Sequence, residues 1–290
     1  MPCINRTSIQ FKRAFLFFGV LFFIGCSSED DCCSDTDTDT TPPPQAEELT
    51  AADREGLVWN DEFDQSTLDT SKWNFQTGDG TAEGIPGWGN GEEQTYTNRT
   101  QNLQLENGFL KITARKESLQ GKSYTSARIN TQDKFSFQYG RIVVRAKLPK
   151  IAGTWPAVWM LGDNYSNVGW PRCGEIDFIE QNGQEKDKII GTSHWFDEGS
   201  SNNAKYSTTL DFPKLTESFQ KYTLVWNESY IRMFVGSAKY YEIAINDTLP
   251  FDQPFFLLIN LAMGGTLGGN INSTFLQEDF LIDYIRVYEN

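Results

Sequence analysis

The 290-residue chain is 39% hydrophobic, which is enough to bury a sizeable core in one large all-β domain or two small ones. Its formal net charge of −14 excludes nucleic acid as the expected partner, because binding a phosphate backbone needs clustered Lys and Arg. Aromatic residues make up 14% of the chain, and this richness favours a β-sandwich or a surface that contacts sugars.

The first 25 residues are predicted to be a lipoprotein signal peptide. Basic residues precede the apolar run AFLFFGVLFFIG, which has the length of a secretory core and is too short to span a bilayer stably. The run ends at Cys26, and the stretch FIGC resembles the lipobox of bacterial lipoproteins. We therefore expect a lipid anchor on Cys26 and an outer-membrane lipoprotein that is exposed at the cell surface. Simple cleavage, followed by secretion or release into the periplasm, is the alternative.

Residues 26–50 are predicted to form an acidic, Thr- and Pro-rich tether. Between Ser27 and Glu48 there are eight acidic residues and no basic ones, so the segment repels itself and stays extended without a core. Residues 51–290 are then expected to form one domain. Cys173 is the single cysteine of that domain, which rules out a disulfide within it, and we expect a packed thiol rather than a nucleophile.

From residue 57 onward, short alternating or apolar segments recur between Gly, Asn, Asp and Pro residues, and none has a long 3.6-residue apolar period. This pattern predicts an all-β fold, a jelly-roll sandwich of two stacked antiparallel sheets, with no second domain. The predicted strands cover residues 102–106, 109–116, 140–148, 155–161, 175–180, 221–227, 230–236, 255–263 and 280–289.

Three acidic residues lie within six positions in the segment GEIDFIE. On a regular strand Glu175 and Asp177 share one face while Glu180 points to the other, because side chains alternate. One extra residue at Phe178-Ile179, accommodated as a β-bulge, returns Glu180 to the face of the other two acids. Both apolar side chains of the bulge then point toward the core. The alternative is an edge strand whose acidic side chains lie on its solvent-exposed face.

Two carboxyl groups on one face suit the hydrolysis of a glycosidic bond. One attacks the anomeric carbon and the other protonates the leaving oxygen, and in retaining enzymes the two lie about 5–5.5 Å apart. Repulsion among three neighbouring carboxylates raises the pKa of at least one, and we expect Glu180 to be the group kept protonated near neutral pH. The chemistry requires no cofactor, and the sequence has no Cys/His zinc spacing and no Gly-rich phosphate loop.

The segments around the acidic cluster resemble the laminarinase-type members of glycoside hydrolase family sixteen. The order WPAxWML, GWPxxGEID and ExDxxE is similar to that group, and the similarity extends over about residues 58–289, from WNDEFD to DYIRVYE. The resemblance implies a curved jelly roll, an open cleft on its concave sheet and retaining endo-hydrolysis of a β-glucan. It also implies that Glu175 is the nucleophile, Glu180 the acid/base and Asp177 the assisting carboxylate.

Seven residues are candidates for contact with sugar. Trp155 and Trp159 are four positions apart and share a face of a strand, where indole rings offer flat apolar surfaces to sugars; core packing is the alternative. The resemblance places aromatic platforms here and polar sugar contacts nearby. A lone histidine is more often structural, so a structural role is the alternative for His194. A surface ion pair is the alternative for Arg128. The candidates are Asn90, Glu92, Arg128, Trp155, Trp159, Trp170 and His194.

The resemblance also implies a structural calcium site. Glu62, the carbonyl of Gly108 and Asp283 match positions that hold this ion in relatives, and oxygen ligands suit calcium. Asp283 lies inside the apolar segment FLIDYIRV, where capping a turn or meeting an Arg is the alternative.

The expected function is endo-hydrolysis of internal β-1,3 linkages in laminarin-like β-glucan by a double displacement. A mixed-linkage β-1,3-1,4-glucanase is the nearest alternative among hydrolases, and a non-catalytic glycan-binding protein of the same fold is the alternative from another class. The intact acidic residues argue against a binding protein, since binding alone needs no acid triad. We expect contact with the membrane only through the lipid anchor, and we predict no protein partner.

Overall fold

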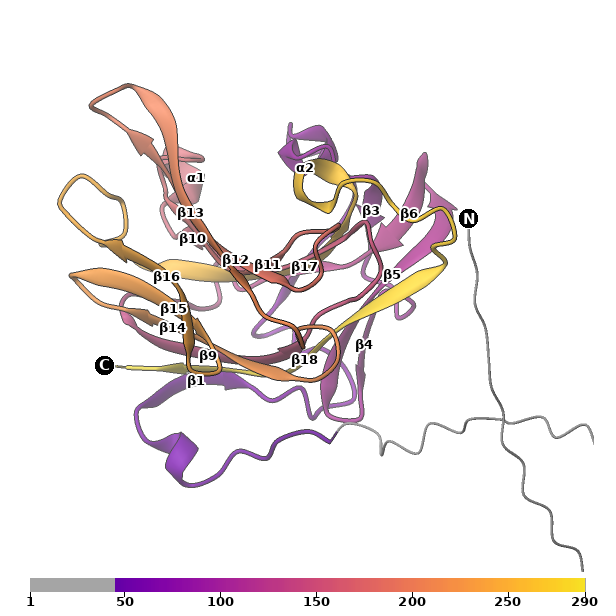
Figure 1. The fold of residues 1–290 in the computed structure, drawn as a ribbon, viewed down its shortest axis with the longest axis horizontal. Coiled ribbons are helices and arrows are strands. Elements are labelled where there is room, and N and C mark those ends of the chain that lie inside the picture. The colour runs from indigo at the N-terminus through magenta and orange to yellow at the C-terminus, as the bar shows by residue number, and fades with distance from the viewer. Residues whose placement is uncertain (1–44, 290) are drawn as a thin grey trace, which may run out of the picture. The chain divides into compact units, whose positions relative to one another are not determined.

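The computed structural model describes residues 45–289, which form a sandwich of two stacked β-sheets (Figure 1). This architecture confirms the predicted all-β sandwich. The predicted signal peptide, Cys26 and the part of the tether up to residue 44 lie outside the described residues. Across residues 45–289, no helix has the length and apolar character needed to cross a membrane.

Among the described residues, ten strands form the larger sheet and eight form the smaller one. Strand pairs are antiparallel except for β3 and β6, which run parallel. The larger sheet has the order β16 (Ala238–Ala244), β15 (Tyr230–Val235), β14 (Gln220–Trp226), β9 (Gly140–Lys147), β18 (Gln277–Tyr288), β5 (Phe109–Leu119), β6 (Lys122–Ser126) and β3 (Gln94–Tyr96), with β1 (Leu57–Asp61) paired to β18 and β4 (Leu103–Glu106) paired to β5.

The smaller sheet carries the acidic cluster. Its strands have the order β13 (Asn202–Asp211), β12 (Lys188–Asp197), β11 (Glu175–Gln181), β10 (Thr154–Gly162), β17 (Phe255–Met263), β7 (Arg128–Asn130) and β2 (Asn74–Gln76), with β8 (Ser136–Phe137) paired to β17. The helical elements of the described chain are single turns in the connections: α1 (Tyr165–Val168), α2 (Gly265–Gly268) and the 3₁₀ turns Ala52–Arg54 and Pro86–Gly89.

The main hydrophobic core lies between the two sheets. Val158 of β10 and Ile176 of β11 are fully buried in it, and Ile142 of β9 joins the same cluster from the larger sheet. Burying one such side chain stabilises the fold by roughly 1.5–3 kcal/mol relative to leaving it exposed. Because side chains alternate along a strand, Ala157 and Trp159 of β10 point to the opposite, outer face of the smaller sheet.

Residues 45–50, predicted to belong to the tether, contact the outer side of the larger sheet (Figure 1). The backbone N–H of Glu47 donates to Oδ2 of Asp283 at 3.0 Å. Its carboxylate pairs with Lys221 at 2.6 Å and with Arg145 at 3.4 Å. The predicted boundary at residue 50 therefore needs correction, because an acidic residue of the segment finds cationic partners on β9 and β14.

Candidate active site

Strand β11 carries the three acidic residues, and its pairing with β10 is irregular between them. Asp177 pairs with Trp159, and the next pair along joins Ile179 to Val158. Phe178 falls between these two pairs, which is the pattern of a β-bulge. Phe178 and Ile179 are both fully buried in the core. The bulge is therefore at the predicted place, and both apolar side chains point inward as expected.

The pairing with β12 shows which way the bulge turns Glu180. Asp177 pairs with Thr192, and Glu180 pairs with Ile190. Directly opposite partners in an antiparallel pair share a face of the sheet, and so do residues two positions apart on one strand. Since Thr192 and Ile190 are two positions apart, Asp177 and Glu180 lie on the same face.

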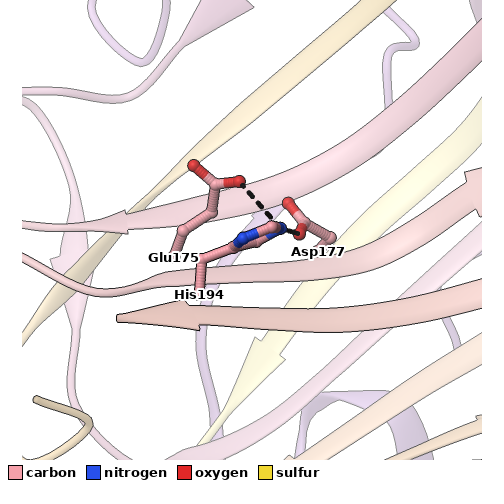
Figure 2. A group of neighbouring side chains, drawn as sticks. All are labelled: Glu175, Asp177 and His194. Carbon is pink, nitrogen blue, oxygen red and sulfur yellow. Dashed lines mark ion pairs between the residues drawn. The ribbon is translucent and has the colours of Figure 1, made fainter. Parts of the chain in front are cut away.

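Glu175, Asp177 and His194 form a compact group on this outer face (Figure 2). Nε2 of His194 lies 3.4 Å from Oδ2 of Asp177 and 3.8 Å from Oε1 of Glu175. His194 pairs with Glu175 across β11 and β12, which brings the imidazole to the carboxyl groups. The side chains of Glu175 and His194 are 17% and 25% exposed, whereas that of Asp177 is 6% exposed. A ligand on the outer face therefore meets Glu175 and His194 before Asp177.

Burial raises the pKa of all three carboxyl groups. After burial, the charge of Asp177 is the next cause that raises the pKa of Glu175, and His194 opposes both. At Asp177 the charge of Glu180 adds to burial, while a hydrogen bond with Glu175 lowers the pKa. The group therefore retains protons at pH values where an exposed carboxyl group is ionised, which general acid catalysis requires.

Glu180 has a hydrogen-bond donor of its own. Nε1–H of Trp155 donates to Oε1 of Glu180 at 3.0 Å. This bond lowers the pKa of Glu180 against the larger, opposite effect of burial. Trp155 is only 9% exposed, so its ring offers less surface for sugar stacking than predicted and acts mainly as the partner of Glu180. Ala157 pairs directly with Glu180, so a single methyl group lies beside the carboxyl group on the β10 side.

A row of polar residues continues across the outer face from β10 to β2. Ala157 pairs with Asn260, Asn260 with Arg128, and Arg128 with Gln76. Nε–H of Arg128 donates to Oε1 of Gln76 at 2.6 Å. Trp159 donates its indole N–H to Oδ1 of Asn260 at 2.8 Å. These hydrogen bonds fix the orientation of the side chains next to the carboxyl cluster.

The guanidinium of Arg128 lies between two indole rings. It is 4.3 Å from the ring centroid of Trp88 and 4.9 Å from that of Trp159. Such cation–π contacts contribute about 0.5–2 kcal/mol each, more when desolvated. Arg128 is buried, so it is a support for the Trp159 ring and not the surface ion pair considered as its alternative. Trp159 itself is partly exposed on the outer face.

Glu92 lies beneath the surface, and Asn90 is the more exposed of the two. The carboxylate of Glu92 accepts hydrogen bonds from Gln94 at 2.6 Å, Tyr96 at 2.9 Å and Asn90 at 3.4 Å. Burial raises the pKa of Glu92, and the nearby charge of Arg128 opposes this effect. Glu92 therefore holds the side chains of Asn90, Gln94 and Tyr96 in place by hydrogen bonds. Its direct contact with sugar stays a prediction.

Trp170 lies next to His194, which contacts the carboxyl cluster. Trp170 is 48% exposed, so core packing does not account for it. The centroids of the Trp170 and His194 rings are 6.1 Å apart. Trp170 is thus the most accessible of the three predicted aromatic platforms.

Cys173 is fully buried and packs with Leu161, Phe256 and Leu258. Burial raises the pKa of its thiol to about 12. A thiol without access to solvent and without thiolate character is a poor nucleophile. This confirms the prediction of a packed thiol.

The residues predicted to bind calcium do not fit that ion as they are arranged. Both oxygens of Glu62 accept hydrogen bonds from Arg286, at 3.0 Å and 2.8 Å. Asp283 is ion-paired with Arg145 and also accepts from Glu47. Calcium requires several free oxygen ligands, and here a guanidinium occupies each carboxylate. The alternative prediction, that Asp283 meets an Arg, matches the structure, and no step of the chemistry involves this region.

Three further residues around the cluster are absent from the sequence prediction. Thr192 pairs with Asp177 across β11 and β12, and its side chain lowers the pKa of Glu180. Lys205 pairs with His194 across β12 and β13, and its charge lowers the pKa of Asp177 and Glu180. Asn260 is the partner of Trp159 described above. A local signal exists only for Asn260, which is the single polar residue in the apolar run FFLLINLAM.

Comparisons with known proteins agree with this geometry. Residues 90–286 match the family Glycosyl hydrolases family 16. The chain is 37% identical over 257 residues to Glucan endo-1,3-beta-glucosidase A1 of Niallia circulans, covering 80% of this chain and 38% of that protein. It is 39% identical over 248 residues to Beta-glucanase of Rhodothermus marinus, covering 80% of this chain and 84% of that protein.

A solved structure with the same fold is the laminarinase catalytic domain from Thermotoga maritima MSB8. It superposes with a TM-score of 0.75 at 41% identity, covering 81% of this chain and 98% of that chain. The matched region includes β10, β11 and β12, which hold the carboxyl cluster. The chain is thus a glycoside hydrolase that belongs to family 16.

Proposed function

We propose that this protein is a retaining endo-β-1,3-glucanase that cleaves internal linkages of a laminarin-like β-glucan. The observation that carries the proposal is the β-bulge at Phe178, which gives Glu175, Asp177 and Glu180 a common outer face. The linkage is supported by relatives named as endo-1,3-β-glucosidase and laminarinase. Because the chain spans 38% of the Niallia circulans protein, the support concerns the catalytic region and not that whole protein.

In the first step, the ionised carboxylate of Glu175 attacks the anomeric carbon of the glucosyl unit at the scissile bond. Glu180 gives its proton to the glycosidic oxygen, which takes the electron pair of the breaking C–O bond and leaves as a sugar hydroxyl. The raised pKa of Glu180 favours the protonated carboxyl group that supplies this proton. His194, which opposes the rise in the pKa of Glu175, favours the ionised nucleophile.

In the second step, water releases the sugar from Glu175. Glu180, now ionised, takes a proton from the water, whose oxygen attacks the anomeric carbon and displaces the Glu175 carboxylate. The two inversions give net retention, and both carboxyl groups return to their starting protonation states. Asp177 lies two positions from Glu175 on the same strand, and its protonation adjusts to the change in charge on Glu175 between the two steps.

The function is tested by incubating residues 45–290 with laminarin, lichenan, agarose and carrageenan and measuring new reducing ends. We expect rapid release of oligosaccharides from laminarin. Preference for lichenan would instead assign a mixed-linkage glucanase, and no product from any β-glucan would contradict the proposal. NMR of the first product anomer checks retention.

Two variants assign the roles, and a third serves as the control. Glu175→Ser should abolish turnover while laminarin binding persists. Glu180→Gln should lower kcat by roughly 10²–10⁴-fold, because the leaving oxygen loses its proton donor. Glu217→Gln removes an exposed carboxylate from the connection between β13 and β14 and serves as the control. Full activity in either of the first two variants would reassign that role.

We also infer that the protein is held at the outer membrane by a lipid on Cys26 and is exposed at the cell surface. The support is the apolar run that ends in FIGC, followed by an acidic stretch. Palmitate labelling in cells, sensitive to globomycin, is expected for the natural chain and absent in Cys26→Ala. Labelling that persists in this variant would rule out Cys26.

A further inference from the structure

The pairing between β10 and β11 ends beside the acid/base residue. Its last pair joins Ala157 to Glu180. Beyond this pair, Thr154 of β10 and Gln181 of β11 continue into a region where both are fully buried. Beyond the last backbone pair, side-chain hydrogen bonds join the two segments. Lys186, from the connection between β11 and β12, makes some of these bonds.

The ammonium group of Lys186 donates to three oxygens. Nζ lies 2.9 Å from the carbonyl oxygen of Thr154, 2.7 Å from its Oγ1 and 3.3 Å from Oε1 of Gln181. Nε2 of Gln181 donates in return to the carbonyl oxygen of Lys186 at 2.6 Å. An ammonium group has three donors, so this set uses all of them. Lys186 therefore links β10 and β11 where their backbone ladder has ended.

Each residue bound by Lys186 is the neighbour of one partner in the Trp155–Glu180 hydrogen bond. Thr154 precedes Trp155, and Gln181 follows Glu180. The indole N–H and the carboxyl oxygen are 3.0 Å apart. The same connection is anchored again by Gly183, whose carbonyl oxygen accepts from Gly153 N–H at 3.0 Å.

We propose that Lys186 is a positioning residue for the acid/base carboxyl group: by bridging Thr154 and Gln181, it holds the Trp155 indole at hydrogen-bonding distance from Glu180. The inference rests on the proposed function, in which Glu180 transfers the proton. A hydrogen-bond donor for a catalytic carboxyl group works only within a narrow range of positions, and misplacement by about 1 Å can lower the rate by as much as 10²-fold.

The environment of Lys186 is unusual for a cation and supports a specific role. Its three acceptors are neutral oxygens, and burial lowers the pKa of its ammonium group to about 7, with the charge of Glu278 on β18 opposing this effect. Loss of the proton removes one of three donors. A lysine that served only for solubility would remain in water, as Lys188 does in an exposed pair with Glu185.

The test compares Lys186→Met with the control Lys188→Met, which changes the exposed lysine at the start of β12. On laminarin, Lys186→Met should lower kcat about tenfold with KM little changed, and the control should retain wild-type kcat. Melting temperatures are measured for both. A lower melting temperature with unchanged kcat, measured well below the transition, would make Lys186 purely structural and overturn the proposal.

A double-mutant cycle identifies the path of the effect. If Lys186 acts through Trp155, then Lys186→Met should lower kcat no further in a Trp155→Phe background. Both single variants should move the alkaline limb of kcat/KM to higher pH, because the Trp155 bond lowers the pKa of Glu180. Independent, additive losses would contradict the proposal.

Two provisions keep the outcome interpretable. If Lys186→Met does not fold, Lys186→Gln, which stays polar but loses the ammonium group that bridges Thr154 and Gln181, is carried through the same cycle, and wild-type kcat in it would overturn the inference. An inactive wild-type enzyme would overturn the proposed function itself, whereas an active wild type with an unaffected Lys186→Met overturns this inference alone.

Discussion

His194 lies with Nε2 3.4 Å from Oδ2 of Asp177, on the strand next to the one that carries all three carboxyl groups. The imidazole therefore contacts two members of a cluster in which burial disfavours negative charge. Its effect extends to both ends of the cluster, because it lowers the pKa of Glu175 and of Glu180.

Replacing His194 should narrow the pH range of activity on the acid side. Glu175 must be ionised to attack, and the acidic limb of kcat/KM reports its pKa in the free enzyme. In His194→Gln the pKa of Glu175 rises, because the imidazole no longer opposes the effects of burial and of Asp177, so the acidic limb should move to higher pH. A pH–rate profile on laminarin measures the shift. An unmoved acidic limb would show that His194 does not act on the nucleophile.

The bulge should depend on a buried hydroxyl group from the larger sheet. The hydroxyl of Tyr240 donates to the carbonyl oxygen of Phe178, the extra residue of the bulge. Tyr240→Phe leaves that buried carbonyl without this donor and should lower the free energy of unfolding by about 1–3 kcal/mol. We also expect a lower kcat, because the carbonyl fixes the backbone between Asp177 and Glu180.

Tyr222 provides a matched control for Tyr240. Its hydroxyl is also buried, and among the described residues it has no hydrogen-bond partner. Tyr222→Phe should therefore leave both kcat and the free energy of unfolding at or above the wild-type values. Urea denaturation and initial rates on laminarin measure both quantities. Equal losses of stability in the two variants would show that the hydrogen bond to the bulge contributes nothing.

The acidic spacing was sufficient to predict the bulge, since only one insertion point returns Glu180 to the face of Asp177 and keeps two apolar residues inside. Apolar alternation similarly located nine of the eighteen strands in the described chain, namely β4, β5, β9, β10, β11, β14, β15, β17 and β18. Strand β13 was missed for a physical reason. It is the edge of the smaller sheet, and its exposed, Thr- and Ser-rich sequence has no apolar side that marks it as a strand.

The supporting side chains of the site could not be found from local patterns. Asn260 meets Arg128 only because β17 pairs with β7, and these strands are more than 100 residues apart. Glu47 and Asp283 are even further apart in the sequence. The predictions of the tether boundary and of the calcium ligands therefore did not include their contact. Such contacts depend on tertiary pairing, which short-range sequence spacing does not determine.

The predicted calcium region should behave as a protein ion-pair site. Asp283→Asn leaves Arg145 without its buried partner and should lower the free energy of unfolding by about 3 kcal/mol. Because an arginine occupies each carboxylate, neither EDTA nor added CaCl₂ should change the melting temperature of the natural chain by calorimetry. A melting temperature that falls with EDTA and recovers with calcium would restore the metal site and overturn the assignment of Glu62 and Asp283 to ion pairs.

Trp170 should contribute to substrate binding and little to folding. Nearly half of its surface is exposed and its ring lies beside that of His194, so truncation removes a stacking surface without opening a core cavity. Loss of about 1 kcal/mol of stacking raises KM roughly fivefold in Trp170→Ala, with kcat and melting temperature unchanged. Trp226→Ala, which empties a fully buried position, should instead destabilise the fold by about 3–5 kcal/mol. A Trp170→Ala variant that melts early but binds laminarin normally would make this residue structural, because a ring that sugar does not touch cannot affect KM.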